Sequence, residues 1–269
     1  MHLPLSSAIA ARLDVVHDVA STNDVLAALV REGDVADFTV VTSTSQRAGR
    51  GRLGRAWTAP AGGMLATSIL VRPRLPGAVA GAVALPTLGW LPLLAGVAVA
   101  DAVRSLVGDH RTTVKWPNDV QIDGLKVAGI LSELQPGADS VVVGIGLNLS
   151  LTAEQLPVPT ATSLLLAGAT ESGDALVDLA LSRMLLRLRE LVDALIAAGG
   201  DARAAGLLDT VSAACGTLGQ RVRVELPGGD DLVGVARSLD DSGRIVVVRE
   251  SDGRPQAVAA GDVTHLRYE

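Results

Sequence analysis

The segment QRAGRGRLGR, residues 46–55, places four arginines and three glycines within ten positions. Arginine offers a rigid fork of N–H donors that matches carboxylates and phosphates, and glycine lets the backbone approach a ligand closely. Because neighbouring positive charges repel, we expect the segment to become ordered only when anions bind. These residue types predict a lid over a substrate pair that carries a carboxylate and a triphosphate. A solvated basic loop is the alternative.

The glycines Gly49, Gly51 and Gly54 have the G-x-G-x-x-G spacing of a dinucleotide-binding turn. That turn requires a preceding strand, a following helix and an acidic residue about 20 positions later. A strand-like stretch precedes the glycines, but the sequence RAWTAPAGGM that follows cannot begin an amphipathic helix. After Gly54 no acidic residue occurs until Asp101, and the chain lacks the G-K-[S/T] of a P-loop. We therefore exclude a Rossmann site.

A second segment, KWPNDVQIDGLKVAGIL at residues 115–131, contains charged side chains and a glycine in a strand-like setting. Joining two anions requires groups that screen their repulsion and the charge that develops on the reacting phosphate, which arginine, lysine and Mg²⁺ can do. Lys126 is a candidate for this role, or else a surface lysine of a hairpin. Asp119 is a candidate Mg²⁺ ligand, an aid to acyl transfer, or a residue that fixes the turn. Gly129 has no side chain, so a ligand could approach the backbone of a strand closely at this position.

The overall composition limits the possible function classes. The chain has 269 residues, of which 48% are hydrophobic, so it can bury a large core. Its net charge of −6 and aromatic content of 2% argue against an RNA-binding module, which needs a basic surface and stacking aromatics. The single cysteine, Cys215, excludes an intrachain disulfide and suits a reducing compartment. Because the N-terminus also lacks the features of a signal peptide, we predict a cytoplasmic protein.

Residues 78–100 carry no charge and are numerous enough to cross a membrane as a helix. The stretch is rich in Ala, Gly and Pro, and it continues into the ordinary helical sequence DAVRSLV. The chain contains no second span of this kind and no basic flank on one side. We therefore predict a buried core helix and no membrane association.

The rest of the pattern mixes helices and strands. Ser21 is placed to cap a helix that Gly33 ends, and the dipeptide Asp123-Gly124 predicts a hairpin turn. Leucine spacing predicts a long helix from Asp174 to about residue 198. Strands rich in valine and isoleucine are predicted at residues 38–46, 63–73, 112–134 and 139–150.

After Cys215 the sequence changes to short stretches in which apolar and polar residues alternate. Turn signals separate these stretches at Pro227-Gly228-Gly229, Ser242-Gly243 and Asp252-Gly253. Five short strands at this spacing predict a small barrel. We therefore predict two domains, residues 1–215 and residues 216–269.

Five motifs occur in order along the chain: STN at 21–23, QRAGRGRLGRAW at 46–57 (the Gly-Arg loop), KWPND at 115–119, KVAGIL at 126–131 and GIGLNL at 144–149. Together they resemble the biotin protein ligases over nearly the whole chain. The resemblance implies an α+β fold, in which a mixed-sheet catalytic domain of the biotin/lipoate ligase type precedes a small SH3-like β-barrel. It also implies that ATP, with Mg²⁺, activates biotin to biotinyl-5′-AMP. Biotin then passes to one lysine of a biotin carboxyl carrier domain.

Residue roles follow from the match to the family's motifs. The residues expected to hold biotin are Ser21, Thr22, Asn23, Gln46, Arg50, Gly51, Arg52, Lys126 and Gly129. The residues expected on the nucleotide side are Arg55, Trp57, Asn118 and Asn148. Arg52 and Lys126 are the expected catalytic residues, with Lys126 contacting the carboxylate and the bridging phosphate. Residues 50–57 are expected to be mobile without ligand and to close over the adenylate, which keeps water from a reactive anhydride.

Two differences from related proteins refine the prediction. Some members carry an N-terminal winged-helix domain and repress biotin genes, whereas here the STN motif begins at residue 21, so we expect no DNA binding. Lipoate ligases share the fold and the adenylation chemistry but differ in the Gly-Arg loop and the KWPND motif, so lipoate is the lesser alternative. The sequence leaves the oligomeric state and the choice of carboxylase acceptor open.

Overall fold

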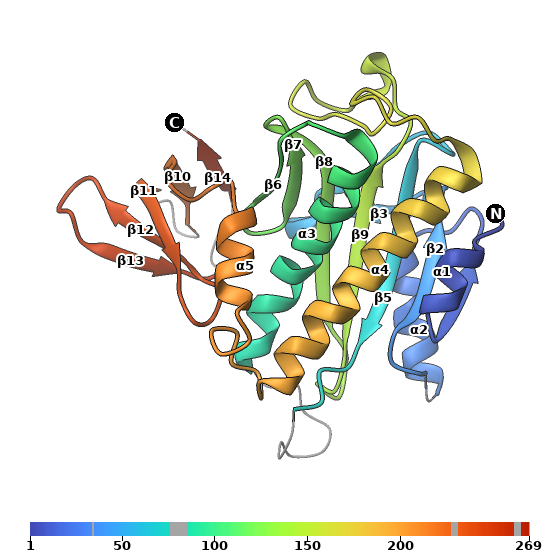
Figure 1. Cartoon of the computed structure of the whole chain (residues 1–269), viewed down its shortest axis with the longest axis horizontal. Helices are drawn as coiled ribbons and strands as arrows, with labels where there is room; N and C mark the ends of the chain where they lie inside the picture. Colours follow the sequence, from blue (N-terminus) through green and yellow to red (C-terminus); the bar gives the residue numbers. More distant parts are fainter. Residues whose placement is uncertain (34, 76–84, 227–230, 261–264, 269) are drawn as a thin grey trace.

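The structure, a computed structural model, describes residues 1–33, 35–75, 85–226, 231–260 and 265–268. In this described part, a seven-stranded sheet has the order β1-β2-β5-β9-β8-β7-β6 (Figure 1). Its strands are β1 (Arg12–Val15), β2 (Thr39–Ser43), β5 (Met64–Val71), β6 (Thr112–Lys115), β7 (Asp119–Ile122), β8 (Leu125–Leu134) and β9 (Val141–Asn148). The helices are α1 (Pro4–Ile9), α2 (Thr22–Glu32), α3 (Leu85–Val107), α4 (Gly173–Ala197) and α5 (Leu207–Ala214). β1 runs parallel to β2 and the other neighbouring strands are antiparallel, so the predicted mixed sheet is confirmed.

Side chains that alternate along the central strands divide the apolar core between the two faces of this sheet. Val40 of β2 belongs to the large buried cluster that also contains residues of α3 and α4. Its neighbour Val41 points the other way, into a smaller cluster with Leu26 of α2. The sheet therefore has α3 and α4 on one face and α2 on the other, and the first residues of α2 reach the face on which the candidate site lies.

The long apolar stretch forms α3, which confirms the predicted core helix over its described part. Among the described residues α3 is the one helix long and apolar enough to cross a membrane, but 78% of its most apolar window is buried inside the protein. Residues 78–84 of the predicted helix lie outside the described residues. Packing of α3 against α4 and the sheet accounts for its apolar composition.

Most of the local predictions are confirmed. α2 begins after Ser21 and ends at Gly33, although the Ser21 hydroxyl makes no capping hydrogen bond. Asp123 and Gly124 join β7 to β8 with positive φ angles of 49° and 84°, as a type I′ turn requires. The helices α1 and α5 and the strand β1 were not predicted, because segments of six, eight and four residues carry too little periodicity.

The C-terminal residues form an antiparallel sheet in the order β13-β12-β11-β10-β14. Its strands are β10 (Arg221–Glu225), β11 (Asp231–Leu239), β12 (Ile245–Arg249), β13 (Pro255–Val258) and β14 (His265–Tyr268). Gly243 and Gly253 have positive φ angles of 75° and 70° in the predicted turns, whereas the predicted turn at residues 227–229 lies outside the described residues. The predicted strands are confirmed, and their closure into a barrel stays a prediction.

Hydrogen bonds and packing join the two sheets at the predicted domain boundary. The indole N–H groups of the buried residues Trp90 and Trp116 donate to the carbonyl oxygens of Asp241 (3.0 Å) and Gly243 (3.1 Å). Val247 of β12 belongs to the same buried cluster as α3 and α4. The apolar core thus continues across residue 215, and the division into two domains stays a prediction.

A chain that ends at residue 215 should unfold at a lower temperature than the full chain. Each buried indole that loses its acceptor costs about 1–3 kcal/mol, and the deletion also exposes apolar core. Against a typical stability of about 5–15 kcal/mol this loss is large. Calorimetry of the two chains measures the difference, and equal melting temperatures would show that the contacts of Trp90 and Trp116 contribute nothing.

Candidate active site

A cavity of about 160 Å³ lies on the α2 face of the larger sheet, between the first residues of α2, the Gly-Arg loop and the strands β7, β8 and β9. The predicted site residues that line it are Ser21, Thr22, Asn23, Gln46, Arg50, Gly51, Arg52, Arg55, Trp57, Asn118, Asp119, Lys126 and Gly129. Asn148 is the one predicted residue that lies outside this lining. The structure therefore brings segments far apart in the sequence to a single cavity.

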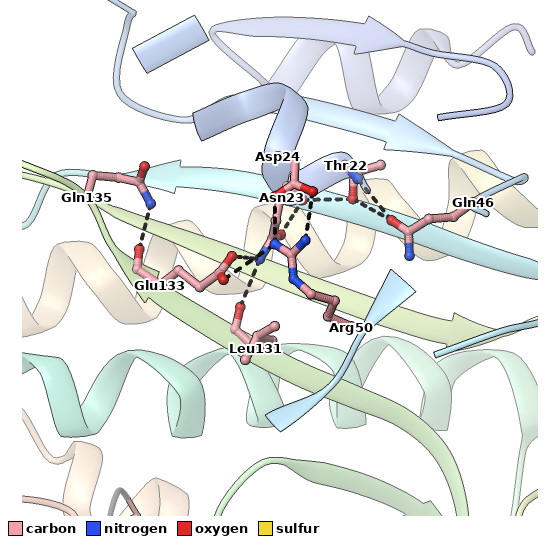
Figure 2. Close-up of polar contacts among 9 residues, drawn as sticks. Thr22, Asn23, Asp24, Gln46, Arg50, Leu131, Glu133 and Gln135 are labelled. Atoms are coloured by element: carbon pink, nitrogen blue, oxygen red, sulfur yellow. Dashed lines mark hydrogen bonds and ion pairs between the residues drawn. The ribbon is translucent and has the colours of Figure 1, made fainter. Parts of the chain in front are cut away.

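The first residues of α2 are held by hydrogen bonds to neighbouring elements (Figure 2). The backbone N–H of Thr22 donates to Oε1 of Gln46 at 2.9 Å, which joins the start of the helix to the start of the Gly-Arg loop. Ser68 Oγ donates to Oδ1 of Asn23 at 2.6 Å, and Nδ2 of Asn23 donates to Oε2 of Glu133 at 2.6 Å. Both ends of the Asn23 amide are thus bonded within the protein, so Asn23 is fixed in the wall of the cavity.

The Gly-Arg loop folds as a narrow ribbon. β3 (Gly49–Arg50) pairs antiparallel with β4 (Ala56–Trp57), and a short 3₁₀ turn (Arg52–Gly54) joins them. Leu53 at the tip is 61% exposed and has a φ of 57°, a left-handed conformation that leucine rarely adopts. The turn directs Leu53 outward, while residues on both strands of the ribbon line the cavity.

Arg47, Arg50 and Arg52 of the loop have partners from other elements. Arg47 pairs with Asp18 at 3.2 Å, and Arg50 donates to both carboxylate oxygens of Asp24. Arg52 donates to the carbonyl oxygen of Ala260, and its Nη1 lies 3.5 Å from Oδ1 of Asn118. The hydrogen bonds from Arg50 lower the pKa of the Asp24 carboxyl. The expectation of unpaired like charge in this loop is therefore wrong, because the fold supplies partners that the local sequence does not contain.

Three glycines, Gly129, Gly144 and Gly146, form the floor of the cavity. The Trp57 indole lies over two of them, since a Cβ at Gly129 would be 3.2 Å from Cζ3 and one at Gly146 would be 2.9 Å from Cζ2. A Cβ at Gly144 would be 2.8 Å from Nδ2 of Asn23. Nε1 of Trp57 is buried and has no hydrogen-bond partner among the described residues. A buried donor without an acceptor is costly, so this N–H is a candidate contact for a bound ligand.

Lys126 and Asp119 lie side by side on neighbouring strands. Nζ of Lys126 is 2.6 Å from Oδ1 of Asp119 and 5.4 Å from the centre of the Trp57 ring. Arg52 and Arg55 also line the cavity, and Arg52 is close enough to Arg55 and Asp119 to interact with both charges. Burial lowers the pKa of nearby Lys115, which lies against the ring of Tyr268. Positive groups therefore outnumber the single carboxylate here, which suits anionic ligands.

Asp119 is the acidic residue on the cavity wall within the described residues. No group of three or more His, Cys, Asp or Glu side chains that could hold a metal occurs in that part of the chain. Mg²⁺ is usually held by one or two carboxylates together with the phosphates of its substrate. One carboxylate beside several positive groups fits that mode of binding, in which ATP would supply most of the oxygen ligands.

Sequence reasoning missed some residues of the site, and Asn148, which was predicted on the nucleotide side, does not line the cavity. Nδ2 of the buried Asn148 donates to the carbonyl oxygen of Thr162 at 2.8 Å. The additional lining residues are Ala56, Ala66, Ile130, Leu131, Gly144, Ile145 and Gly146. The alternating glycines of the GIGLNL motif were a signal for the floor, since glycines two positions apart on a strand face the same side.

Comparison with known proteins identifies related families for both parts of the chain. Residues 15–150 match the model of the biotin/lipoate A/B protein ligase family. Residues 217–266 match the model of the biotin protein ligase C terminal domain. The first match contains all five motifs, and the second covers the strands β10 to β13 and the start of β14.

Individual proteins align with nearly the whole chain. The biotin–[acetyl-CoA-carboxylase] ligase of Mycobacterium tuberculosis is 41% identical over 260 residues, which cover 95% of this chain and 90% of the relative. The enzyme of the same name from Paracoccus denitrificans is 34% identical over 235 residues, 83% of this chain and 88% of the relative. The structure of a biotin protein ligase from Aquifex aeolicus in complex with biotin and ATP superimposes with a TM-score of 0.73 at 26% identity, covering 96% of this chain and 100% of that one.

Proposed function

The chain belongs to the biotin/lipoate A/B protein ligase family, and we propose that its cavity binds biotin and ATP side by side. It is a biotin protein ligase, which activates biotin with ATP and transfers it to a protein lysine. The observation that supports the placement of both substrates is the convergence of the STN motif, the Gly-Arg loop and Lys126 on this one cavity.

The end of the cavity beside α2 suits the uncharged ring system of biotin. Thr22 and Gln46 offer neutral hydrogen-bonding groups there, and Ser21 lies beside them in the wall. Gly144 forms the floor at this end, beside the Asn23 amide, whereas Gly129 lies under the Trp57 indole and next to Nζ of Lys126. We assign the ureido and thiophene rings of biotin to this end.

The other end carries the positive charge that a triphosphate requires. Lys126, Arg52 and Arg55 line it, with Asn118 between Arg52 and the strand β8. Bidentate guanidinium groups and a point-charge ammonium both match phosphate oxygens. We assign the phosphates of ATP to this end, with the carboxylate of biotin directed toward Lys126 and the Trp57 indole helping to enclose the adenylate.

The reaction then has two steps, adenylation of biotin and transfer of biotin to the acceptor lysine. A carboxylate oxygen of biotin attacks the α-phosphorus of ATP, the bond from that phosphorus to the bridging oxygen breaks, and pyrophosphate leaves. In the second step the amine nitrogen of the acceptor lysine attacks the acyl carbon, the bond to AMP breaks, and the amine gives up a proton. Lys126 and Arg52 screen the two anions that must meet in the first step. Mg²⁺, held by Asp119 and the phosphates, would neutralise further phosphate charge.

The acceptor we propose is the biotin carboxyl carrier domain of a biotin-dependent carboxylase. The relatives that align with this chain are named as ligases acting on acetyl-CoA carboxylase, which supports this choice. We place the enzyme in the cytoplasm, where ATP is supplied and where a free thiol such as that of Cys215 persists.

Incubation of the protein with labelled biotin, ATP, Mg²⁺ and a carrier domain tests the proposal. We expect label on one carrier lysine, with release of pyrophosphate and AMP. Replacing biotin by lipoate in the same assay tests the alternative acyl substrate, and label from lipoate alone would overturn the assignment. An RNA mobility shift unaffected by biotin and ATP would favour the binding-module alternative.

Residues 50–57 should gain protection from amide hydrogen exchange when biotinyl-5′-AMP binds. The loop is tied down largely by exposed ion pairs, and such pairs contribute about 0–1 kcal/mol each, so local opening costs little free energy. Exchange followed by mass spectrometry measures the change, with the fully buried strand β5 as the internal control. Equal protection of the loop with and without the adenylate would contradict a closing lid.

A further inference from the structure

An ion pair that none of the roles above uses ties the Gly-Arg loop to α2. Arg50 donates from Nη1 to Oδ2 of Asp24 at 2.7 Å and from Nη2 to Oδ1 at 2.6 Å (Figure 2). Asp24 lies in the first turn of α2, directly after the STN motif, where a negative charge also suits the helix dipole. The dipole alone accounts for an acid at this position, but it does not account for a bidentate contact. That contact fixes the direction of the guanidinium as well as its distance.

A second carboxylate approaches the same guanidinium. Oε1 of Glu133 lies 3.6 Å from Nη2 of Arg50, while its Oε2 accepts the hydrogen bond from Nδ2 of Asn23 (Figure 2). Glu133 therefore connects Arg50 on the loop to the STN motif on the helix. Two carboxylates around one guanidinium leave this end of the site with a net negative charge, in contrast to the end that contains Lys126.

We propose that Asp24 and Glu133 form an acidic clamp that positions Arg50 and so holds the first strand of the Gly-Arg loop across the biotin end of the cavity. This inference rests on the proposed function. Neither carboxylate is among the residues that line the cavity, so both act through Arg50. The net negative charge also disfavours the carboxylate of biotin at this end and favours binding with the carboxylate toward Lys126.

Asp24→Asn tests the clamp, because it keeps the shape of the side chain and removes its charge. We expect the KM for biotin to rise by up to about fivefold, the upper limit for loss of an exposed ion pair. The kcat at saturating biotin should stay within about twofold, since Asp24 touches no reacting atom. Asp24→Glu restores the charge and should recover part of the lost affinity. The matched control is Asp18→Asn, which breaks the pair with Arg47 on the same loop, outside the cavity, and should leave the KM unchanged.

A double-mutant cycle assigns the effect to Arg50. If Asp24 acts only through Arg50, the double variant Asp24→Asn/Arg50→Gln should have the same KM as Arg50→Gln alone. Additive effects in the cycle, or an Asp24→Asn variant with the KM of Asp18→Asn, would overturn the clamp. A wild-type protein that transfers no biotin would instead contradict the proposed function, so the two failures are distinguishable.

Discussion

Lys126→Ala should slow the formation of biotinyl-5′-AMP by about 10²–10³-fold, the loss typical of removing one group that stabilises developing charge. The ammonium group lies in the cavity between Asp119 and the Trp57 ring, where it can screen two anions. The fold should be unaffected, because the backbone N–H and C=O of Lys126 bond residues 160 and 162 whatever the side chain. Pyrophosphate release without any carrier domain measures this first step alone.

Lys126→Arg is the matched control. It keeps the positive charge but replaces a compact ammonium with a planar fork, so we expect a rate between those of the wild type and the Ala variant. The melting temperatures of all three proteins should agree closely. Pyrophosphate release at the wild-type rate in Lys126→Ala would show that this lysine is only a surface residue of the hairpin.

Arg52→Ala should let biotinyl-5′-AMP escape about 10–100-fold faster, because a hydrogen bond to a charged group contributes about 1.5–3 kcal/mol. Arg52 joins the tip of the Gly-Arg loop to Ala260, which lies beyond β13 near the C-terminal sheet, and to Asn118 beside the cavity. Burial lowers the pKa of Arg52, because its guanidinium is partly shielded from water. Without it the loop loses its contact with the C-terminal residues and closes less firmly.

The escape is measured after the protein has been removed from the reaction by filtration. It is the ratio of free adenylate in the filtrate to biotin attached to the carrier. Arg47→Ala is the control, since Arg47 lies on the same loop but pairs with Asp18 outside the cavity, and its variant should release no more adenylate than the wild type. Unchanged leakage in Arg52→Ala would remove Arg52 from the lid.

Local signals in the sequence were enough to predict most helices and strands and most of the cavity lining. Helix α2 and the Asp123-Gly124 hairpin depend on periodicity and turn chemistry, which act between near neighbours in the chain. Most residues of the cavity lining could also be predicted, because anion contacts call for arginine and lysine and close approach calls for glycine such as Gly129. Asn148 lies outside this lining, and its role on the nucleotide side stays a prediction.

The contacts that these residues make could not be predicted from the sequence. The local sequence predicted unpaired charge on the Gly-Arg loop, yet the fold brings Asp24, 26 positions away, to Arg50. It brings Ala260, 208 positions away, to Arg52. It also lays Trp57 on the glycine floor and bonds the Asn23 amide to Glu133. Backbone propensities act between residues that are close in the sequence. Charge pairing and close packing instead depend on distances in space, which the order of the strands in the sheet sets.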